Sequence, residues 1–516
     1  MSVYDRLSVE VLFAELRGTD ARERLQGALD AAGANGWIIG APMPDPGDPS
    51  RNGFEVTPPI GIPPLGVAEG WKLAHAVANG SGGDVEPVFA GDVPLPPPEQ
   101  PDAAFAFSDP DDALPPPPIN WQLELLAGIE LPAVDDIEVA QPDTGYTDHP
   151  ELGGVIDTNA ASSFLPGETS ARDPLQRGLL LQPGHGTATA SVLAARQGTT
   201  SPRSDTGEMV DLVGAAAGAK VIPLRVTTTV IILGWQRRLA QAIEAGVERK
   251  ARVISISLGG LGGSRLERAC RLAESRGVIV VCAAGNYYPA VVAPASYPSV
   301  VAVAATGPTG EPWRYSAHGP EVTIAAPGHR VWVAAWDDAG RAIARLGSGT
   351  SFGTAYVAGL AARWIARHKA RLDASATTPA RFRAALASAI AKLLPEGYGA
   401  GLLDPAKLLS NPLTDPAPAD RAFSASEVER SPLQREEAFH RQLAALADEG
   451  DAWRNSSPPL RARRGALRVE QGRDAAGVAR GPEEQRSAPS VAYVADGTEV
   501  TIRVNLRIRV TLERPS

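Results

Sequence analysis

The chain has 516 residues, enough for one large folded domain with smaller segments around it. Its 49 Lys and Arg against 59 Asp and Glu give a formal net charge of −10, so no overall cationic field is present to hold a nucleic acid or an anionic membrane. Only two cysteines occur, Cys270 and Cys282, which excludes a disulfide-stapled scaffold and a multi-thiolate zinc site. We expect each to pack as a small apolar side chain.

The N-terminal residues 1–18 mix acidic with apolar side chains and lack both the basic start and the small-residue cleavage site of a secretory signal. No apolar run in the chain reaches the roughly 18 residues that are needed to cross a bilayer. We therefore expect no membrane segment and a cytoplasmic location, with export by another route left open.

Residues 1–93 alternate between strand-like and helix-like patterns. The predicted elements are a strand at 8–16, a helix around 25–32, extended pieces at 37–39 and 54–56, a helix around 67–78 and a strand at 85–89. The order βαββαβ is typical of a small split α+β domain. Residues 94–120 are rich in proline, which favours an extended linker.

From residue 121 to residue 410, short β-branched runs alternate with amphipathic helices, which predicts an α/β domain with a mostly parallel sheet. The candidate strands are 137–140, 221–226, 253–257, 278–282, 300–304 and 322–325. Residues 239–247 and 266–273 show the helical spacing expected of crossover helices between such strands.

The last hundred residues divide into two segments. Residues 411–490 are charged and poor in large apolar side chains, which predicts a largely disordered linker with one helix around 436–447. Residues 491–516 alternate between apolar and polar residues around Asp496-Gly497, the pattern of a β-hairpin. Because an isolated hairpin is marginally stable, we expect its apolar face to be covered by another sheet edge or by a partner chain.

Two polar residues in the α/β domain stand where catalytic groups are commonly found. Asp143 lies in DTG after the first predicted strand, at the carboxyl edge of the sheet where ligand sites form. His185 lies between two glycines in GHGT, at the start of an Ala-rich helix, and a neutral imidazole suits a general base near neutral pH. Taken singly, Asp143 also fits a turn cap, and His185 a core or capping histidine.

Two further positions complete the set. Ser351 lies in GTS at the first turn of a predicted helix, where backbone N–H groups and the helix dipole favour negative charge on a substrate oxygen. Asn286 lies in AAGN at the end of an apolar strand, where its amide can donate to an oxyanion. The alternative roles are an ordinary N-cap serine and a turn asparagine.

Together the motifs DTG, HGT, AAGN and GTS, in this order, resemble the subtilases, the subtilisin-like serine peptidases. The resemblance extends to the stretches between them, over about 290 residues from Trp121 to Leu409. Those stretches are SISLGG at 255–260, SYPSVVAVAAT at 296–306, YSAHGPEVTIAAPG at 315–328 and GAGLLDPAKLL at 399–409. The resemblance implies a subtilisin-like three-layer fold.

The resemblance also implies a role for each motif residue. Ser351 would be the nucleophile, His185 the general base, and Asp143 the group that orients and stabilises the imidazole. Asn286 and the Ser351 N–H would hold the oxyanion. The substrate would be a protein or peptide bound as an added strand. The stretches matching the substrate walls of the family are Ser257, Leu258, Gly259 and Gly260, and Ala283, Ala284 and Gly285.

This chain departs from the common subtilase pattern at a few positions. Ala188 stands where many members carry a second histidine, Ala355 where a proline normally follows the nucleophile, and Pro142 where an aliphatic residue precedes the aspartate. Glu151 matches an acidic position that supplies a calcium ligand in some relatives, but residues 196–211 do not resemble their calcium-binding loop. We therefore assign no metal ligand and no cofactor that the chemistry requires, and a structural calcium ion stays open but unsupported.

The sequence thus predicts a serine endopeptidase that is made as a zymogen, with residues 1–93 resembling the subtilase propeptide in pattern. On this reading the N-terminal domain is a partner of the peptidase domain, and processing falls between Phe89 and Trp121. Two alternatives stay open: a dedicated intracellular maturation peptidase for one partner, and a catalytically silent subtilase-fold binding module that docks through the terminal hairpin.

Overall fold

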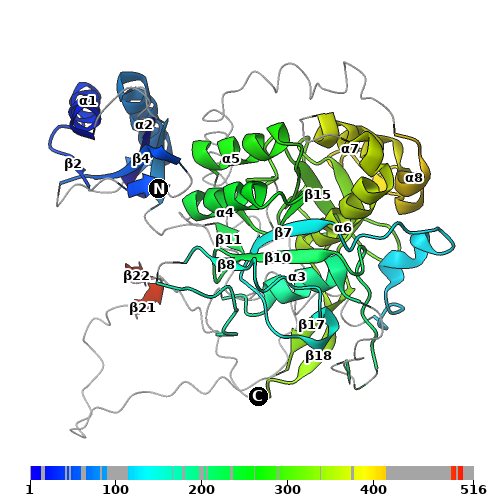
Figure 1. Cartoon of the computed structure of the whole chain (residues 1–516). Coiled ribbons are helices and arrows are strands. Elements are labelled where there is room, and N and C mark those ends of the chain that lie inside the picture. The colour runs from blue at the N-terminus through cyan, green and yellow to red at the C-terminus, as the bar shows by residue number, and fades with distance from the viewer. Residues whose placement is uncertain are drawn as a thin grey trace, which may run out of the picture. The chain divides into compact units, whose positions relative to one another are not determined.

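A computed structural model of the chain describes residues 2–12, 18–40, 43–45, 48–59, 65–81 and 84–89, most of 114–413, and 490–495 and 498–503 (Figure 1). Between 114 and 413 the residues left out are 166, 177–180, 197–202, 205–206, 208, 233–235, 261, 288–289, 338 and 373–376. The chain divides into two units, Met1–Gln442 and Leu443–Ser516.

In the N-terminal part, strand β1 (Ser2–Leu12) pairs antiparallel with β4 (Asp48–Thr57) and β6 (Asp84–Phe89). The two predicted helices are present as α1 (Gly18–Ala31) and α2 (Val67–Ser81). The short strands of this part are β2 (Ile38–Ile39), β3 (Met43–Asp45) and β5 (Leu65–Gly66). The predicted order is found with two additional short strands, β3 and β5, and β1 begins six residues before the predicted start.

Among the described residues of the α/β part, a nine-stranded sheet has the order β19-β20-β16-β15-β14-β12-β7-β10-β8. All neighbouring strands in it are parallel except β19 and β20. The six predicted strands are β7 (Glu138–Asp143), β10 (Lys220–Arg225), β12 (Val253–Ile256), β14 (Ile279–Ala283), β15 (Val301–Thr306) and β16 (Ile324–Pro327). The remaining strands are β8 (Ser162–Ser163), β19 (Ile390–Lys392) and β20 (Leu402–Leu403), of which β8 and β19 lie at the two edges.

Strand β7 is longer than predicted. It continues through Pro142 to Asp143, because β10 stays in register with it as far as Arg225 opposite Asp143. On its other side, β12 pairs only with Val139 and Ala140, so the missing N–H of Pro142 interrupts no ladder there. Asp143 is therefore held by the sheet itself rather than by a loop after it.

Helices cover both faces of the sheet, giving three layers (Figure 1). Alternate residues of one strand point to opposite faces, so Val253 packs into one core and Ile254 into the other. The first core includes α3 (His185–Ala194) and α6 (Thr350–His368), and the second includes α4 (Gln236–Glu248) and α5 (Ser264–Ser275). The predicted three-layer α/β fold is confirmed.

Smaller elements complete the α/β part. These are the 3-10 helices η2 (Trp121–Leu126), η3 (Pro150–Leu152) and η4 (Lys369–Arg371), the helices α7 (Thr377–Ser388) and α8 (Pro405–Ser410), and the strands β9 (Arg203–Ser204), β11 (Ile231–Ile232), β13 (Gly259–Gly260), β17 (Val331–Trp336) and β18 (Ala342–Gly347). Strand β11 pairs with β13, and β17 pairs with β18, which pairs with β9.

The end of the Pro-rich segment makes specific contacts rather than serving only as a spacer. The Arg330 guanidinium donates to the carbonyls of Leu114 and Pro115, each at 2.8 Å, and Trp332 Nε1 donates to the carbonyl of Pro117 at 3.2 Å. Trp121 Nε1 in turn donates to the Arg330 carbonyl at 2.9 Å. Residues 114–121 are thus tied to the start of β17, whereas the linker residues 94–113 lie outside the described part.

In the C-terminal unit, β21 (Ser490–Ala495) and β22 (Thr498–Arg503) form an antiparallel hairpin. Ala495 pairs with Thr498, so the two strands flank the Asp496-Gly497 pair at which the turn was predicted, and these two residues lie outside the described part. The helix predicted at 436–447 and the rest of the predicted second strand lie outside the described residues. Within the part of the chain that the structure describes, none of the helices is long and apolar enough to span a membrane.

Candidate active site

The structure brings Asp143 and His185 into direct contact. Asp143 ends β7 and His185 begins α3, and His185 Nδ1 lies 2.8 Å from Asp143 Oδ1. Both side chains are buried, the imidazole to 0% exposure and the carboxylate to 1%. The same Oδ1 accepts the N–H of Thr144 at 2.7 Å, and Oδ2 lies 3.3 Å from the Thr189 hydroxyl. These contacts fix the carboxylate and, through it, the orientation of the ring.

Two glycines allow the DTG and HGT segments to approach this closely. A Cβ atom on Gly186 would lie 2.1 Å from the Gly145 carbonyl oxygen and 3.2 Å from Asp143 Cβ. A Cβ atom on Gly145, where φ is 105°, would lie 2.3 Å from the Ala171 carbonyl oxygen. A side chain at Gly186 would push the DTG and HGT segments apart, and one at Gly145 would displace the Ala171 segment that packs against DTG.

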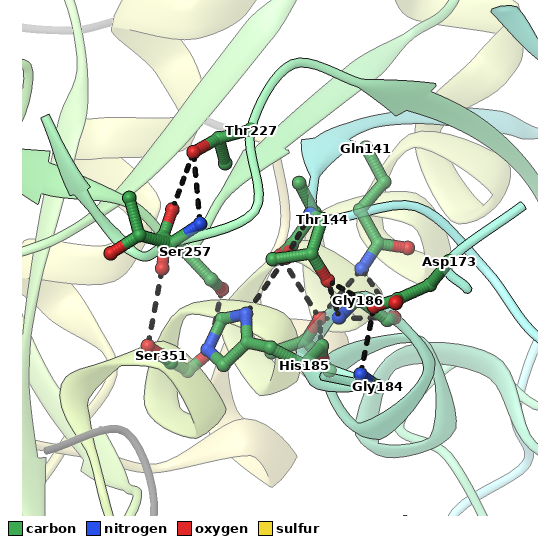
Figure 2. A network of polar contacts seen from close by, with 12 residues as sticks. Gln141, Thr144, Asp173, Gly184, His185, Gly186, Thr227, Ser257 and Ser351 are labelled. Atoms are coloured by element: carbon green, nitrogen blue, oxygen red, sulfur yellow. Dashed lines mark hydrogen bonds and ion pairs between the residues drawn. The ribbon is translucent and has the colours of Figure 1, made fainter. Parts of the chain in front are cut away.

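Ser351 lies in the first turn of α6, as predicted. Figure 2 shows the His185 ring beside it. The Ser351 hydroxyl donates to the Ser257 carbonyl at 3.2 Å, and the Ser257 hydroxyl donates to the Ser351 carbonyl at 3.0 Å. Attack on a substrate by Ser351 requires the hydroxyl proton to pass to the imidazole instead of being donated to the Ser257 carbonyl.

Asn286 is held by the residue that precedes Ser351. Its Oδ1 accepts both the N–H and the hydroxyl of Thr350, each at 2.9 Å. Because the oxygen and nitrogen of a carboxamide lie on opposite sides of the group, these two bonds turn the NH₂ donor away from Thr350. Gly285 N also donates to the Thr350 hydroxyl at 3.2 Å, so the asparagine segment and the serine helix form one unit.

A network behind His185 was not predicted from the sequence (Figure 2). Asp173 Oδ2 accepts the N–H of Gly184 at 2.7 Å and the hydroxyl of Thr144 at 3.0 Å. The Thr144 hydroxyl in turn accepts the N–H of Gly186 at 3.1 Å. Burial raises the pKa of Asp173, and the backbone donors and the nearby Arg225 act against that rise. The residues on both sides of His185 are thereby connected to one carboxylate.

Arg225 is a second residue that the sequence analysis missed. It lies opposite Asp143 at the end of β10, is 1% exposed, and its Nε is 2.7 Å from the Glu168 carboxylate. Its guanidinium also donates to the Thr144 carbonyl. An arginine at the end of an apolar strand, VIPLR, is the one local sign that could have indicated a buried arginine with an acidic partner at the sheet edge.

Both stretches predicted as substrate walls contact the start of α6, Ser257 through Ser351 and Gly285 through Thr350. Ser257 follows β12, Gly259 and Gly260 form β13, and Ala283 ends β14. Leu258 and Ala284 are buried, whereas Gly259 and Gly285 are partly exposed. The two stretches are therefore adjacent to the nucleophile, and their role in binding substrate remains a prediction.

Glu151 is the residue whose position matches a calcium ligand in some subtilases. Glu151 is fully buried, and its Oε2 accepts the N–H of Leu212 at 3.1 Å. No group of three or more His, Cys, Asp or Glu side chains that could hold a metal occurs in the described part. Cys270 and Cys282 are both buried in the core on the α4 and α5 face, as predicted, and burial raises the pKa of both thiols.

Comparison with known proteins agrees with this geometry. The family model "Subtilase family" matches residues 135–401. A thermostable alkaline protease of Halalkalibacterium halodurans is 34% identical over 229 residues, which cover 43% of this chain and 55% of that protein. Subtilisin BL of Lederbergia lenta is 33% identical over 233 residues, 44% of this chain and 75% of that protein.

Among solved structures, the chain resembles fervidolysin from Fervidobacterium pennivorans, which is described as a keratinolytic enzyme related to subtilisin. The TM-score is 0.54 at 20% identity, over 80% of this chain and 62% of that one, so this likeness concerns the fold. The family match spans about half of the 516 residues and contains all four motifs. The chain belongs to the subtilase family of serine peptidases.

Proposed function

We propose that this chain is a serine endopeptidase of the subtilisin type, which hydrolyses peptide bonds through an acyl-enzyme on Ser351. The observation that carries the proposal is the buried pair of Asp143 and His185, with Nδ1 and Oδ1 2.8 Å apart, beside a serine in the first turn of α6. A carboxylate, an imidazole and a hydroxyl in this order are the groups that acyl transfer requires.

In the first half of the reaction, Ser351 Oγ attacks the scissile carbonyl while His185 Nε2 accepts its proton. Asp143 accepts the Nδ1–H, which fixes the tautomer and stabilises the imidazolium that forms. The Asn286 NH₂ group and the Ser351 N–H donate to the oxyanion of the tetrahedral intermediate. His185 then returns the proton to the leaving amine as the C–N bond breaks, which leaves the acyl group on Ser351.

In the second half, a water molecule gives its proton to His185 and attacks the acyl carbonyl. The second tetrahedral intermediate uses the same two donors, and its collapse releases the carboxylic acid and returns the proton to Ser351. In subtilisin, loss of the serine or histidine costs on the order of 10⁶ in kcat, so these two residues should dominate the rate here as well.

We also propose that residues 1–93 act as an inhibitory propeptide. The support is the order of their elements, two helices and an antiparallel sheet formed by β1, β4 and β6. A protein or peptide is the proposed substrate, bound in an extended form against the Ser257–Gly260 and Ala283–Gly285 stretches so that main-chain hydrogen bonds align it.

The test of the proposed activity uses a fluorophosphonate probe and a protein substrate on the processed chain. The wild-type protein should label at one site and hydrolyse the substrate, and Ser351→Ala should do neither. Ser388→Ala, which removes an exposed hydroxyl that donates to the Ala385 carbonyl on α7, is the matched control and should behave as wild type. Labelling that persists in Ser351→Ala would refute the assignment of the nucleophile.

A further inference from the structure

A valine side chain occupies the space between the two predicted substrate walls. A Cβ atom on Gly259, in the first wall, would lie 2.3 Å from Val292 Cγ2. A Cβ atom on Gly285, in the second wall, would lie 3.0 Å from the same methyl group and 3.1 Å from Val292 Cγ1. Each wall therefore has a glycine where it contacts Val292. The isopropyl group of Val292 occupies the volume that a side chain at either glycine would need.

Backbone hydrogen bonds hold Val292 in this position. Its N–H donates to the Ala284 carbonyl of the second wall at 2.9 Å. The next residue, Ala293, exchanges two hydrogen bonds with Gly260 of the first wall, at 3.0 and 3.1 Å. The consecutive residues Val292 and Ala293 thus connect the two walls. The Val292 side chain is buried, with 1% exposure, and as a β-branched side chain it has few allowed rotamers. The valine cannot easily move out of the space.

The same two walls also contact the nucleophile segment. Ser257, two residues before Gly259, accepts the Ser351 hydroxyl at 3.2 Å (Figure 2). Gly285 donates to the hydroxyl of Thr350 at 3.2 Å. The space between the walls therefore begins beside Ser351, where the side chain on the acyl side of the cleaved bond must be placed when its carbonyl carbon meets Oγ.

We propose that Val292 determines specificity by closing this space, so that the residue on the acyl side of the cleaved bond is restricted to glycine or alanine. The inference rests on the proposed peptidase function. A longer side chain would meet the two γ-methyl groups between rigid walls, and a well-packed site accommodates added methylenes poorly. Selection of this kind lowers kcat/KM for large residues, by roughly 10-fold or more per misfit group.

The test uses a series of peptide anilides that differ only in the residue before the anilide, which is Gly, Ala, Val, Leu or Phe. The wild-type chain should cleave the Ala peptide at least about 100-fold faster in kcat/KM than the Phe peptide. Val292→Gly should raise kcat/KM for the Leu and Phe peptides by about 10-fold or more, and Val292→Ala by less.

Val291→Gly and Val291→Ala are the matched controls. Val291 is the neighbouring buried valine, but its Cγ2 lies against Gly319 rather than between the walls, and it packs into the core on the α4 and α5 face. These variants test for a general loosening of the segment and should keep the wild-type ranking of the five peptides. The fluorophosphonate labelling rate should stay within a few-fold of wild type in all of them.

Two results would overturn the inference alone: a wild-type chain that labels at Ser351 and cleaves the Phe peptide as fast as the Ala peptide, or Val291 variants that broaden specificity as much as Val292 variants do. The wild-type ranking decides the question even where a variant fails to fold. A wild-type chain that neither labels nor cleaves any peptide would overturn the proposed function, and this inference with it.

Discussion

Asp173 accepts the backbone N–H of Gly184 at 2.7 Å, so a carboxylate eleven residues upstream fixes the residue immediately before His185. The Thr144 hydroxyl, which donates to Asp173, accepts the N–H of Gly186 and so fixes the residue immediately after His185. The imidazole is consequently positioned from two sides by groups that do not touch it. Catalytic geometry depends steeply on such positioning, because a displacement of about 1 Å can cost about 100-fold in rate.

We predict that Asp173→Asn lowers kcat by about 10- to 100-fold while KM changes little. In the variant, the NH₂ group of the amide would face the Gly184 N–H, which now donates to a carboxylate oxygen. Because two donors cannot bond to each other, the segment before His185 would shift. Steady-state kinetics and the rate of fluorophosphonate labelling measure the effect, and the two rates should fall together. Asp148→Asn, at an exposed carboxylate that pairs with Arg172, should leave both unchanged. Equal losses in the two variants would argue against a positioning role.

Asn286→Ala should lower kcat by about 10² to 10³, the loss seen when an oxyanion donor is removed from subtilisin. Thr350→Val should also lower kcat, but by less, because it removes one of the two donors that orient the Asn286 amide. Thr350→Ser keeps the hydroxyl and serves as the control with a rate near wild type. If Thr350→Val and Thr350→Ser were equally active, the orientation of the amide would not depend on this hydroxyl.

Stability should fall at acidic pH through His149. Burial lowers the pKa of His149 from 6.5 to about 4. Between these two values the unfolded chain binds a proton at this residue and the folded chain does not, so the free energy of unfolding decreases as pH falls, by up to about 3 kcal/mol. Urea denaturation of the Ser351→Ala protein, which avoids self-digestion, can be followed at pH 7 and pH 4.5.

The His149→Gln variant isolates this contribution from that of the carboxylates. Glutamine carries no titrating proton but keeps a donor for the Ile343 carbonyl, which now lies 3.2 Å from His149 Nε2. In the same Ser351→Ala background, the loss of stability between pH 7 and pH 4.5 should be smaller in the variant. Parallel pH profiles for the two proteins would show that His149 contributes nothing to acid sensitivity.

Processing is predicted to occur before Leu114. Arg330 binds the carbonyls of Leu114 and Pro115, so these residues are part of the folded peptidase domain and are unavailable as an extended substrate. N-terminal sequencing of the mature protein should therefore find a first residue between 90 and 114, and the Ser351→Ala protein should retain residue 1 or 2. A mature chain that begins after Leu114 would contradict the prediction.

The sheet and the positions of the four motifs could be predicted from the sequence because they depend on local patterns. Buried β-branched runs such as VISI specify parallel strands, and Gly-flanked polar residues such as His185 follow them at the sheet edge. The resemblance to subtilases then assigned a role to each. The end of β7 was missed because its length depends on pairing with β10, whose residues lie 82 positions further along the chain, and not on Pro142 alone.

The supporting residues could not be predicted for the same reason. Asp173 stands in ARDPL, which has the composition of an ordinary turn, and its partners Thr144 and Gly184 lie 29 and 11 residues away. Val292 stands in a run of small apolar residues that is typical of a core, and only the folded chain places it between Gly259 and Gly285. Tertiary contact, rather than propensity, gives these residues their importance.

The position of Ser351 on α6 also determines how the protein should lose activity on heating. From Thr350 to Ile365 every residue of this helix is buried. Amide protons in such a segment exchange with solvent only when most of the domain unfolds. The nucleophile therefore lies in the part of the domain that unfolds last. Thermal inactivation should accordingly follow the rate of whole-domain unfolding, with no earlier phase in which the fold survives but the serine has lost its place.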